Sequence, residues 1–213
     1  MIIAIDGPSG SGKGTVARLL AKQLDFAVLD TGRLYRLFAY YVLKQGINPS
    51  DHTSVISFLT HFNLSFEELN LDILREDWIA KAASIVSQYK EVRMAFLNQQ
   101  RAFAHHPPSS KKGAILDGRD IGTVVLPTAD LKIFITADVE VRAQRRWKEL
   151  QEHNITCEFD NILKDLKERD QRDMHRVNSP LKAAPDAHII DTSTLNPLRV
   201  TQMVLQLMHT PSI

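Results

Sequence analysis

Short apolar runs recur along the chain and predict the strands of a parallel sheet. Each run ends in a polar residue or a glycine, which is typical of a strand that is buried on both faces. The runs are Ile2–Ile5, Ala27–Leu29, Ala114–Leu116, Leu131–Ile135 and His188–Ile190. Segments with helical spacing separate these runs, so the sequence predicts an α/β fold with a five-stranded parallel sheet.

The helices are predicted from apolar residues that recur three and four positions apart. After the first strand this spacing is formed by Val16, Leu19, Leu20 and Leu24. Two strongly charged helices are expected over residues 139–152 and 160–175. A last amphipathic helix is expected over residues 197–209, with Pro197 in its first turn.

A long segment separates the second predicted strand from the third. It contains more than eighty residues and shows helical spacing over residues 34–44, 52–62 and 78–104. Because this length is too great for one crossover between neighbouring strands, the segment predicts a helical subdomain inserted into a single domain. It ends at a breaker-rich loop, residues 105–113.

The bulk composition is that of an ordinary globular protein. The chain has 213 residues, of which 44% are hydrophobic and 24% are charged. Its formal net charge of +1 gives no basic field that would favour nucleic acid or a membrane surface. One cysteine, Cys157, excludes an intrachain disulfide and fits a reducing compartment. With neither a leader pattern nor a long apolar stretch, we expect a soluble cytoplasmic protein.

A glycine-rich loop follows the first predicted strand. It reads Gly7, Pro8, Ser9, Gly10, Ser11, Gly12, Lys13, Gly14 and Thr15. Strand, glycine loop and helix in this order form a phosphate-binding loop, in which backbone N–H groups and a lysine bind the phosphates of a nucleotide. The strict pattern has Ser or Thr directly after the lysine to bind Mg²⁺, whereas here that hydroxyl comes one position later, at Thr15.

A regulatory GTPase is disfavoured by two missing motifs. The chain contains neither an Asn-Lys-x-Asp guanine reader nor an Asp-x-x-Gly switch segment. Three arginine-rich clusters point instead to an enzyme that brings two anionic substrates together: residues 30–36, 117–123 and 168–176. The first two clusters follow strands, at the sheet edge where open α/β folds bind ligands. Asp117 ends an apolar strand, from which a carboxylate can orient Mg²⁺ or its waters.

The motifs together resemble those of bacterial-type cytidylate kinases, within the nucleoside monophosphate kinase group. The resemblance rests on Gly-Lys-Gly-Thr at 12–15, Leu-Asp-Thr-Gly at 29–32 with Tyr35-Arg36, Arg-Ala-Phe at 101–103, and the blocks 117–125 and 168–176. It implies a three-layer P-loop kinase fold over residues 1–213. It also implies an acceptor-binding subdomain over residues 36–105 and a short lid over residues 145–160.

The resemblance further implies a role for each matching residue. Gly7–Thr15 would bind ATP, and Thr15 and Asp117 would hold its Mg²⁺, directly or through water. Arg36, Arg119 and Arg176 would hold the acceptor phosphate, while Ser84, Arg93 and Asp120 would read the cytosine edge. Arg169 and Asp173 would face the ribose, and Asp30, Thr31 and Tyr35 would shape the acceptor pocket. Lys13, Arg119, Arg145, Arg146 and Arg176 would stabilise the transferring phosphoryl group.

One segment departs from the family pattern. Residues 64–75 replace a longer, strand-rich part of the acceptor subdomain, while Ser84 and Arg93 lie beyond this change.

The reaction that the resemblance implies is transfer of the γ-phosphoryl group of ATP·Mg²⁺ to CMP, with dCMP as a second acceptor and a monomer as the acting form. The alternatives are a kinase for another acceptor such as UMP, and a catalytically weak nucleotide-binding protein.

Overall fold

The computed structural model describes residues 1–108, 110–152 and 155–209. Its five strands are β1 (Ile2–Asp6), β2 (Ala27–Asp30), β3 (Ala114–Gly118), β4 (Leu131–Thr136) and β5 (His188–Asp191). They form one sheet in the order β2-β3-β1-β4-β5, and all four pairings are parallel. The predicted α/β fold and its five-stranded parallel sheet are confirmed.

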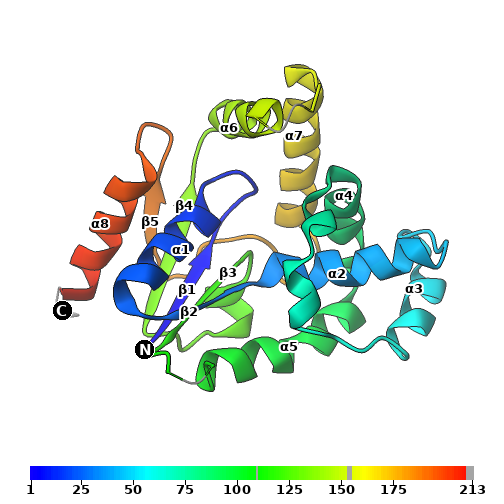
Figure 1. Ribbon diagram of the computed structural model, residues 1–213, viewed down its shortest axis with the longest axis horizontal. Coiled ribbons are helices and arrows are strands. Elements are labelled where there is room, and N and C mark those ends of the chain that lie inside the picture. Colours follow the sequence, from blue (N-terminus) through cyan, green and yellow to red (C-terminus); the bar gives the residue numbers. More distant parts are fainter. Residues whose placement is uncertain (109, 153–154, 210–213) are drawn as a thin grey trace.

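Helices cover both faces of the sheet (Figure 1). Ile3 and Ile5 of β1 pack in one apolar core with residues of α1 (Lys13–Leu24) and α8 (Pro197–His209). Ala4 faces the other way, into a second core shared with α2 (Thr31–Lys44), α4 (Asp77–Val86) and α5 (Lys90–His105). Successive side chains of a strand point to opposite faces, so this alternation produces the three layers.

The inserted segment is helical, with differences from the predicted bounds. It contains α2, α3 (His52–Leu59), two 3₁₀ helices η1 (Glu67–Asn70) and η2 (Asp72–Arg75), α4 and α5. The predicted helix over 52–62 stops at Leu59, where the Thr60 hydroxyl donates to the Ser57 carbonyl at 2.8 Å. The predicted stretch 78–104 divides at Ser87–Tyr89, because Tyr89 is extended and the Ser87 hydroxyl donates to the Ser84 carbonyl.

Two charged helices stand over the sheet edge at which the strands end (Figure 1). They are α6 (Val139–Glu152), whose bounds match the prediction, and α7 (Phe159–His175). They pack on each other through a small separate core of Ala143, Leu150, Ile162 and Leu166. The predicted lid, residues 145–160, includes residues 153 and 154, which lie outside the described part of the chain. Within the described ranges, no helix is long and apolar enough to cross a membrane.

Candidate active site

The glycine-rich loop lies between β1 and α1, and its conformation depends on glycine at its first position. Gly7 has a φ of 150°, and a Cβ atom there would lie 1.9 Å from the Ile135 carbonyl oxygen. Lys13 is the first residue of α1, and its Nζ donates back across the loop to the Pro8 carbonyl at 2.9 Å. The loop therefore packs closely against β4 and keeps its lysine folded over its own backbone.

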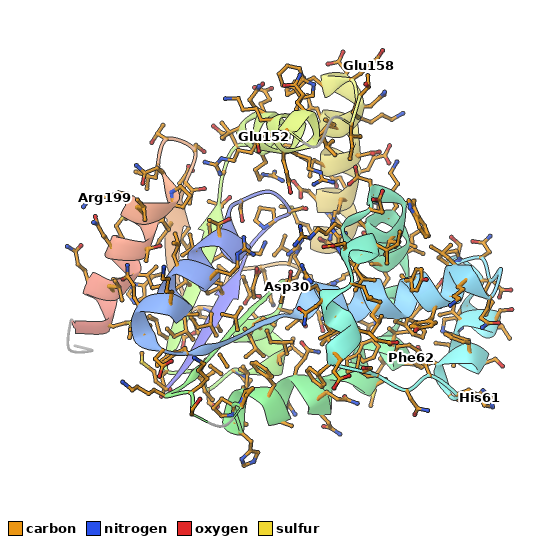
Figure 2. All side chains as sticks on the ribbon, in the orientation of Figure 1. Asp30, His61, Phe62, Glu152, Glu158 and Arg199 are labelled. Atoms are coloured by element: carbon orange, nitrogen blue, oxygen red, sulfur yellow. The ribbon has the colours of Figure 1, made fainter. Side chains whose placement is uncertain are left out.

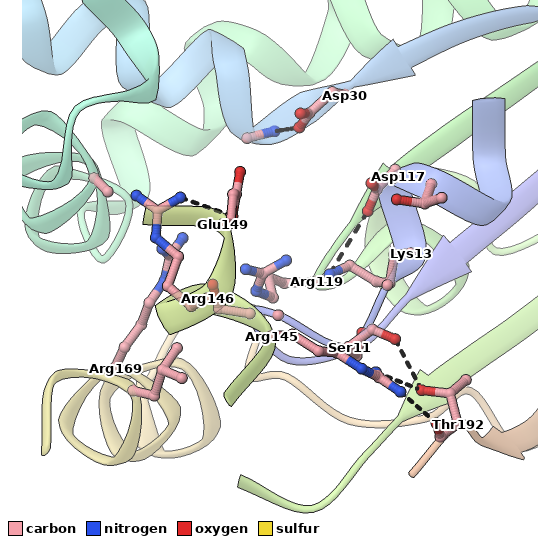
Figure 3. A pocket seen from close by; sticks show the side chains of 18 of the residues that line it. Ser11, Lys13, Asp30, Asp117, Arg119, Arg145, Arg146, Glu149, Arg169 and Thr192 are labelled. Atoms are coloured by element: carbon pink, nitrogen blue, oxygen red, sulfur yellow. Dashed lines mark hydrogen bonds and ion pairs between the residues drawn. The ribbon is translucent and has the colours of Figure 1, made fainter. Parts of the chain in front are cut away.

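Lys13 is paired with the carboxylate that ends β3. Its Nζ lies 3.8 Å from Oδ1 of Asp117, and both side chains are buried (Figure 3). Burial lowers the pKa of Lys13, and the nearby Arg119 lowers it further. Burial raises the pKa of Asp117, which the ammonium of Lys13 opposes. An anionic ligand beside Lys13 would therefore favour its charged form.

The same carboxylate gives a reason for glycine at position 14. A Cβ atom on Gly14 would lie 3.2 Å from Oδ2 of Asp117 and 3.4 Å from a guanidinium nitrogen of Arg18. Such contacts are tight, so a serine or threonine at this position would crowd the Asp117 carboxylate. Thr15 is exposed, and its hydroxyl accepts from Arg18 at 3.3 Å. The departure from the strict loop pattern thus leaves room for Asp117.

A cavity of about 590 Å³ opens in front of the loop and extends beneath α6 and α7 (Figure 3). It brings together most of the predicted site residues. From the loop it is lined by Ser9, Gly10, Ser11, Gly12, Lys13, Gly14 and Thr15. From the other elements it is lined by Asp30, Arg36, Asp117, Arg119, Arg145, Arg146 and Arg169. Figure 2 shows Asp30 at the junction between the sheet and α2.

Arginine side chains crowd the cavity around one buried carboxylate. Nε of Arg119 lies 3.0 Å from Oδ2 of Asp173, and Nε of Arg169 lies 3.8 Å from the same oxygen. Burial alone would raise the pKa of Asp173, but the guanidinium groups of Arg119 and Arg169 hold it below its usual value, and Arg119 has the larger effect of the two. Arg36 donates to the Leu74 carbonyl at 2.7 Å. The cavity has more cations than this carboxylate can neutralise, which suits phosphate groups.

A second group of predicted residues lies beside this cavity rather than in its wall. The Asp120 carboxylate is placed between Arg93, to which it is hydrogen-bonded, and Arg176, whose Nη2 lies 3.7 Å from Oδ1. The Arg93 guanidinium lies 5.4 Å from the centre of the Tyr35 ring. Arg93, Asp120 and Tyr35 line a neighbouring cavity of about 290 Å³. The Ser84 hydroxyl accepts from Nε of Arg172 at 3.2 Å.

Thr31 is placed away from both cavities. Its side chain is buried, and its hydroxyl donates to the Asp117 carbonyl at 2.8 Å. In the structure this residue joins the start of α2 to β3, so its support for the acceptor pocket is indirect. Gly7 and Pro8 likewise shape the loop without lining the larger cavity.

Helices α6 and α7 make contacts on both sides of the cavity. Nη2 of Arg145 donates to the Thr192 carbonyl at 2.5 Å, and the Thr192 hydroxyl donates to the Ser11 carbonyl at 3.0 Å (Figure 3). Arg146 of α6 pairs with Asp77 of α4 at 2.7 Å. Lys81 of α4 pairs with Asp165 of α7 at 2.9 Å. These two ion pairs join α6 and α7 to α4 of the inserted segment across the cavity.

Sequence reasoning missed two buried residues beside the loop. Arg142 of α6 donates to the Ser9 carbonyl at 3.0 Å and to Asp170 of α7 at 2.6 Å, so it connects the loop to α6 and α7. It shares its helix with Arg145 and Arg146, and the sequence carries no signal that separates them. Asp6, at the end of β1, accepts two backbone N–H groups from residues 121 and 122. Its position directly before the loop was the available signal.

The fold and the site together define a P-loop phosphotransferase. A solved shikimate kinase from Bacteroides thetaiotaomicron has a similar fold, with a TM-score of 0.50 and 12% identity over 99% of each chain. The family model described as cytidylate kinase matches residues 3–210, so the chain belongs to the cytidylate kinase family.

Two relatives show how closely the chain follows this family. A cytidylate kinase from Rhodospirillum rubrum is 50% identical over 195 residues, which cover 92% of this chain and 91% of the relative. A cytidylate kinase from Bordetella bronchiseptica is 43% identical over 212 residues, which cover 96% of this chain and 93% of the relative. The family predicted from the sequence is confirmed.

Proposed function

We propose that this protein transfers the γ-phosphoryl group of ATP to CMP, giving ADP and CDP, and that it also accepts dCMP. One observation carries the proposal within the confirmed family: a single cavity joins the loop lysine, Lys13, to the arginines at the ends of the neighbouring strands. A nucleotide-binding protein without catalytic activity would need the loop alone. A phosphotransferase must also hold a second anion, and the arginines supply that site.

The donor nucleotide would bind along the loop. Its phosphates would accept hydrogen bonds from backbone N–H groups of the loop and from the Lys13 ammonium, at the positive N-terminal end of α1. The apolar side chains of Leu195, Pro197 and Val200 line the same cavity and offer a surface for a base. We assign Arg145 and Arg146, in the predicted lid, to the donor phosphates, because both line the same cavity as the loop.

Mg²⁺ accompanies ATP in this proposal, and Asp117 and Thr15 would hold it directly or through water. Both residues line the cavity, and carboxylate and hydroxyl oxygens are ligands that Mg²⁺ prefers. When bound, the ion would neutralise charge on the β- and γ-phosphates. Asp117 is already fixed beside Lys13, so this chain's own contribution is to place a carboxylate where the phosphates end.

The acceptor would bind between the sheet and the inserted subdomain, residues 36–105. Arg36, Arg119 and Arg176 are assigned to its phosphate, and Arg169 and Asp173 to its ribose. The Ser84, Arg93 and Asp120 side chains are assigned to the cytosine edge, and all three are buried. The assignment is supported by their burial and by the pairing of Arg93 with Asp120.

The chemistry needs no strong general base. The second pKa of a phosphate monoester is about 6, so the CMP phosphate is mostly dianionic at neutral pH. One of its oxygens attacks the γ-phosphorus as the bond to the β,γ-bridging oxygen breaks and ADP leaves. The protein contributes position and cationic groups directed at the transferring phosphoryl group. Closure of the lid would exclude water, which would otherwise hydrolyse ATP.

A coupled assay of ADP release tests this proposal. CMP, dCMP, UMP, AMP and GMP are compared as acceptors at saturating ATP·Mg²⁺, and we expect the highest kcat/KM for CMP, followed by dCMP. ADP release that does not depend on any acceptor would overturn the proposal. We further expect a monomer that acts in the cytoplasm, which sedimentation and cell fractionation would measure.

A further inference from the structure

Asp6 ends β1 directly before the phosphate-binding loop, and the mechanism above does not use it. Its side chain is buried, with 4% of its surface exposed. Each carboxylate oxygen accepts one backbone N–H: Oδ1 from Ile121 at 2.8 Å and Oδ2 from Gly122 at 2.7 Å. These donors are the first two residues of the π-helix η3 (Ile121–Val125). A carboxylate of β1 therefore caps a helix that lies 115 positions further along the chain.

The residue that would ordinarily cap this helix is Asp120. Aspartate at an N-cap usually accepts a backbone N–H of its own helix. Asp120 occupies that position, yet its side chain makes no cap hydrogen bond. Its carboxylate is turned instead toward Arg93 and Arg176.

A side chain of β4 also lies close to η3 at Gly122. A Cβ atom on Gly122 would lie 3.2 Å from Cδ of Lys132 and 3.5 Å from Oδ2 of Asp6. Lys132 is itself fixed by Asp186, at 2.7 Å. Gly122 therefore lies close to both a β4 side chain and the Asp6 carboxylate, two residues after Asp120.

We infer that Asp6 is a positioning residue for acceptor recognition: by capping η3 in place of Asp120, it allows the Asp120 carboxylate to stay turned toward Arg93 and Arg176, the groups assigned to the acceptor. This inference rests on the proposed function, in which Asp120 reads the acceptor base. Asp6 itself touches neither substrate. The donor side has its own supports, since Gly7 packs on Ile135 and Arg142 holds the Ser9 carbonyl. The effect of Asp6 is therefore directed to the acceptor.

The Asp6→Asn variant tests the inference. Asparagine has the same shape, but its NH₂ group faces a backbone donor and leaves one buried N–H without an acceptor. The Asp120 carboxylate is the nearest replacement cap, and when it turns to that N–H it leaves Arg93 and Arg176. We expect the KM for CMP to rise about tenfold, equivalent to about 1.4 kcal/mol, and the KM for ATP to change by less than about twofold. The assay is run at about pH 8, above the pKa of about 7 that burial gives Asp6.

Two comparisons separate positioning from a general loss of structure. Asp130→Asn is the matched control, because Asp130 accepts the Ile2 N–H at 2.6 Å at the opposite end of β1 and should leave both KM values unchanged. In an Asp120→Ala background, Asp6→Asn should add nothing to the KM for CMP, since its effect passes through Asp120. Effects that multiply in the double variant, or an equal rise of both KM values in Asp6→Asn, would overturn the inference.

A measurement on the unaltered protein covers the case in which Asp6→Asn does not fold. Amide hydrogen exchange of Ile121 and Gly122 is followed with CMP alone and with a non-hydrolysable ATP analogue alone. Because coupling between sites is reciprocal, CMP should slow this exchange and the analogue should not. Equal protection by both, or by neither, contradicts the inference. If the unaltered enzyme phosphorylates CMP but Asp6→Asn has the same KM for CMP, the inference fails alone; if no CMP is phosphorylated, the proposed function fails.

Discussion

Arg169 of α7 gives a test of whether the proposed acceptor site is held at a cost in stability. Its side chain lines the larger cavity, and its Nε has no hydrogen-bond partner in the described structure. It shares one oxygen of Asp173 with Arg119, which lies closer at 3.0 Å. Without substrate, Arg169 is therefore a largely buried cation that lies beside a second cation, Arg119, and the two share the single carboxylate of Asp173.

The loss of stability caused by the buried Arg169 charge follows from the pKa of its guanidinium. Burial, and after it the neighbouring Arg119, lower the pKa of Arg169 from 12.5 to about 10, and Asp173 opposes this shift only in part. A difference of this size corresponds to about 3 kcal/mol against the charged form, and the 20% exposure of the side chain reduces it through solvent screening. We expect Arg169→Met, which keeps the aliphatic stem, to raise the free energy of unfolding by about 1–3 kcal/mol in the absence of ligand.

Thermal unfolding with and without CMP measures this directly. For a protein of this size, each kcal/mol shifts Tm by about 2–4 °C. The variant should therefore unfold several degrees above the unaltered protein when ligand is absent, and saturating CMP should stabilise it less. Its KM for CMP should rise at least about tenfold, the equivalent of one charged hydrogen bond.

The matched control for this experiment is Arg75→Met, in η2. Arg75 is 66% exposed and pairs with Asp72, which is 91% exposed, so its loss should change neither Tm nor KM. A lower Tm of ligand-free Arg169→Met would refute the reasoning, because it would show that Asp173 outweighs burial and Arg119. An unchanged KM for CMP would show that Arg169 does not serve the acceptor.

Three further outcomes are expected. Gly14→Ala should change the stability by less than about 1 kcal/mol but reduce kcat, since its Cβ would crowd the Asp117 carboxylate at 3.2 Å; unchanged kcat with normal unfolding would contradict this. Burial raises the pKa of Asp6 from 3.8 to about 7, so the folded protein retains a proton that the unfolded chain has released. As the pH rises from about 4 to about 7, the free energy of unfolding of the unaltered protein, measured in urea, should therefore fall relative to that of Asp6→Asn, by up to about 4 kcal/mol. A rise over the same range would contradict a raised pKa for Asp6. Lys13→Ala should lower kcat at least about 10³-fold without loss of folding, whereas Lys22→Ala, on the exposed side of α1, should be as active as the unaltered enzyme in the same assay.

The strands and the longer helices could be predicted because each carries a local periodicity. α6 begins and ends where the charge and apolar pattern predicts, at Val139 and Glu152. The π-helix η3 could not be predicted in this way, because its cap comes from Asp6, in a strand at the other end of the chain. The division between α4 and α5 was also missed, since a serine hydroxyl and one extended tyrosine interrupt an otherwise continuous helical pattern.

The site was predicted as a set of residues but not as a set of contacts. Arg142, Arg145 and Arg146 lie on one helix, and the sequence does not distinguish them. The structure turns Arg142 to the loop, Arg145 to Thr192 and Arg146 to Asp77 of the inserted subdomain. Thr31 was predicted in the acceptor pocket, but its hydroxyl donates to the Asp117 carbonyl of β3 instead. Such differences depend on the direction in which each side chain leaves its element.

The sequence by itself determined the class of enzyme, because a glycine loop between a strand and a helix, and arginines after strands, are local patterns with direct chemical meaning. Only the tertiary structure decided which charges meet. The strand order β2-β3-β1-β4-β5 places Asp6, Asp30 and Asp117 at one sheet edge, although they lie far apart in the chain. Asp6 and Asp117 are buried there, and burial raises the pKa of both carboxyl groups, an effect that cannot be read from residues that are neighbours in sequence.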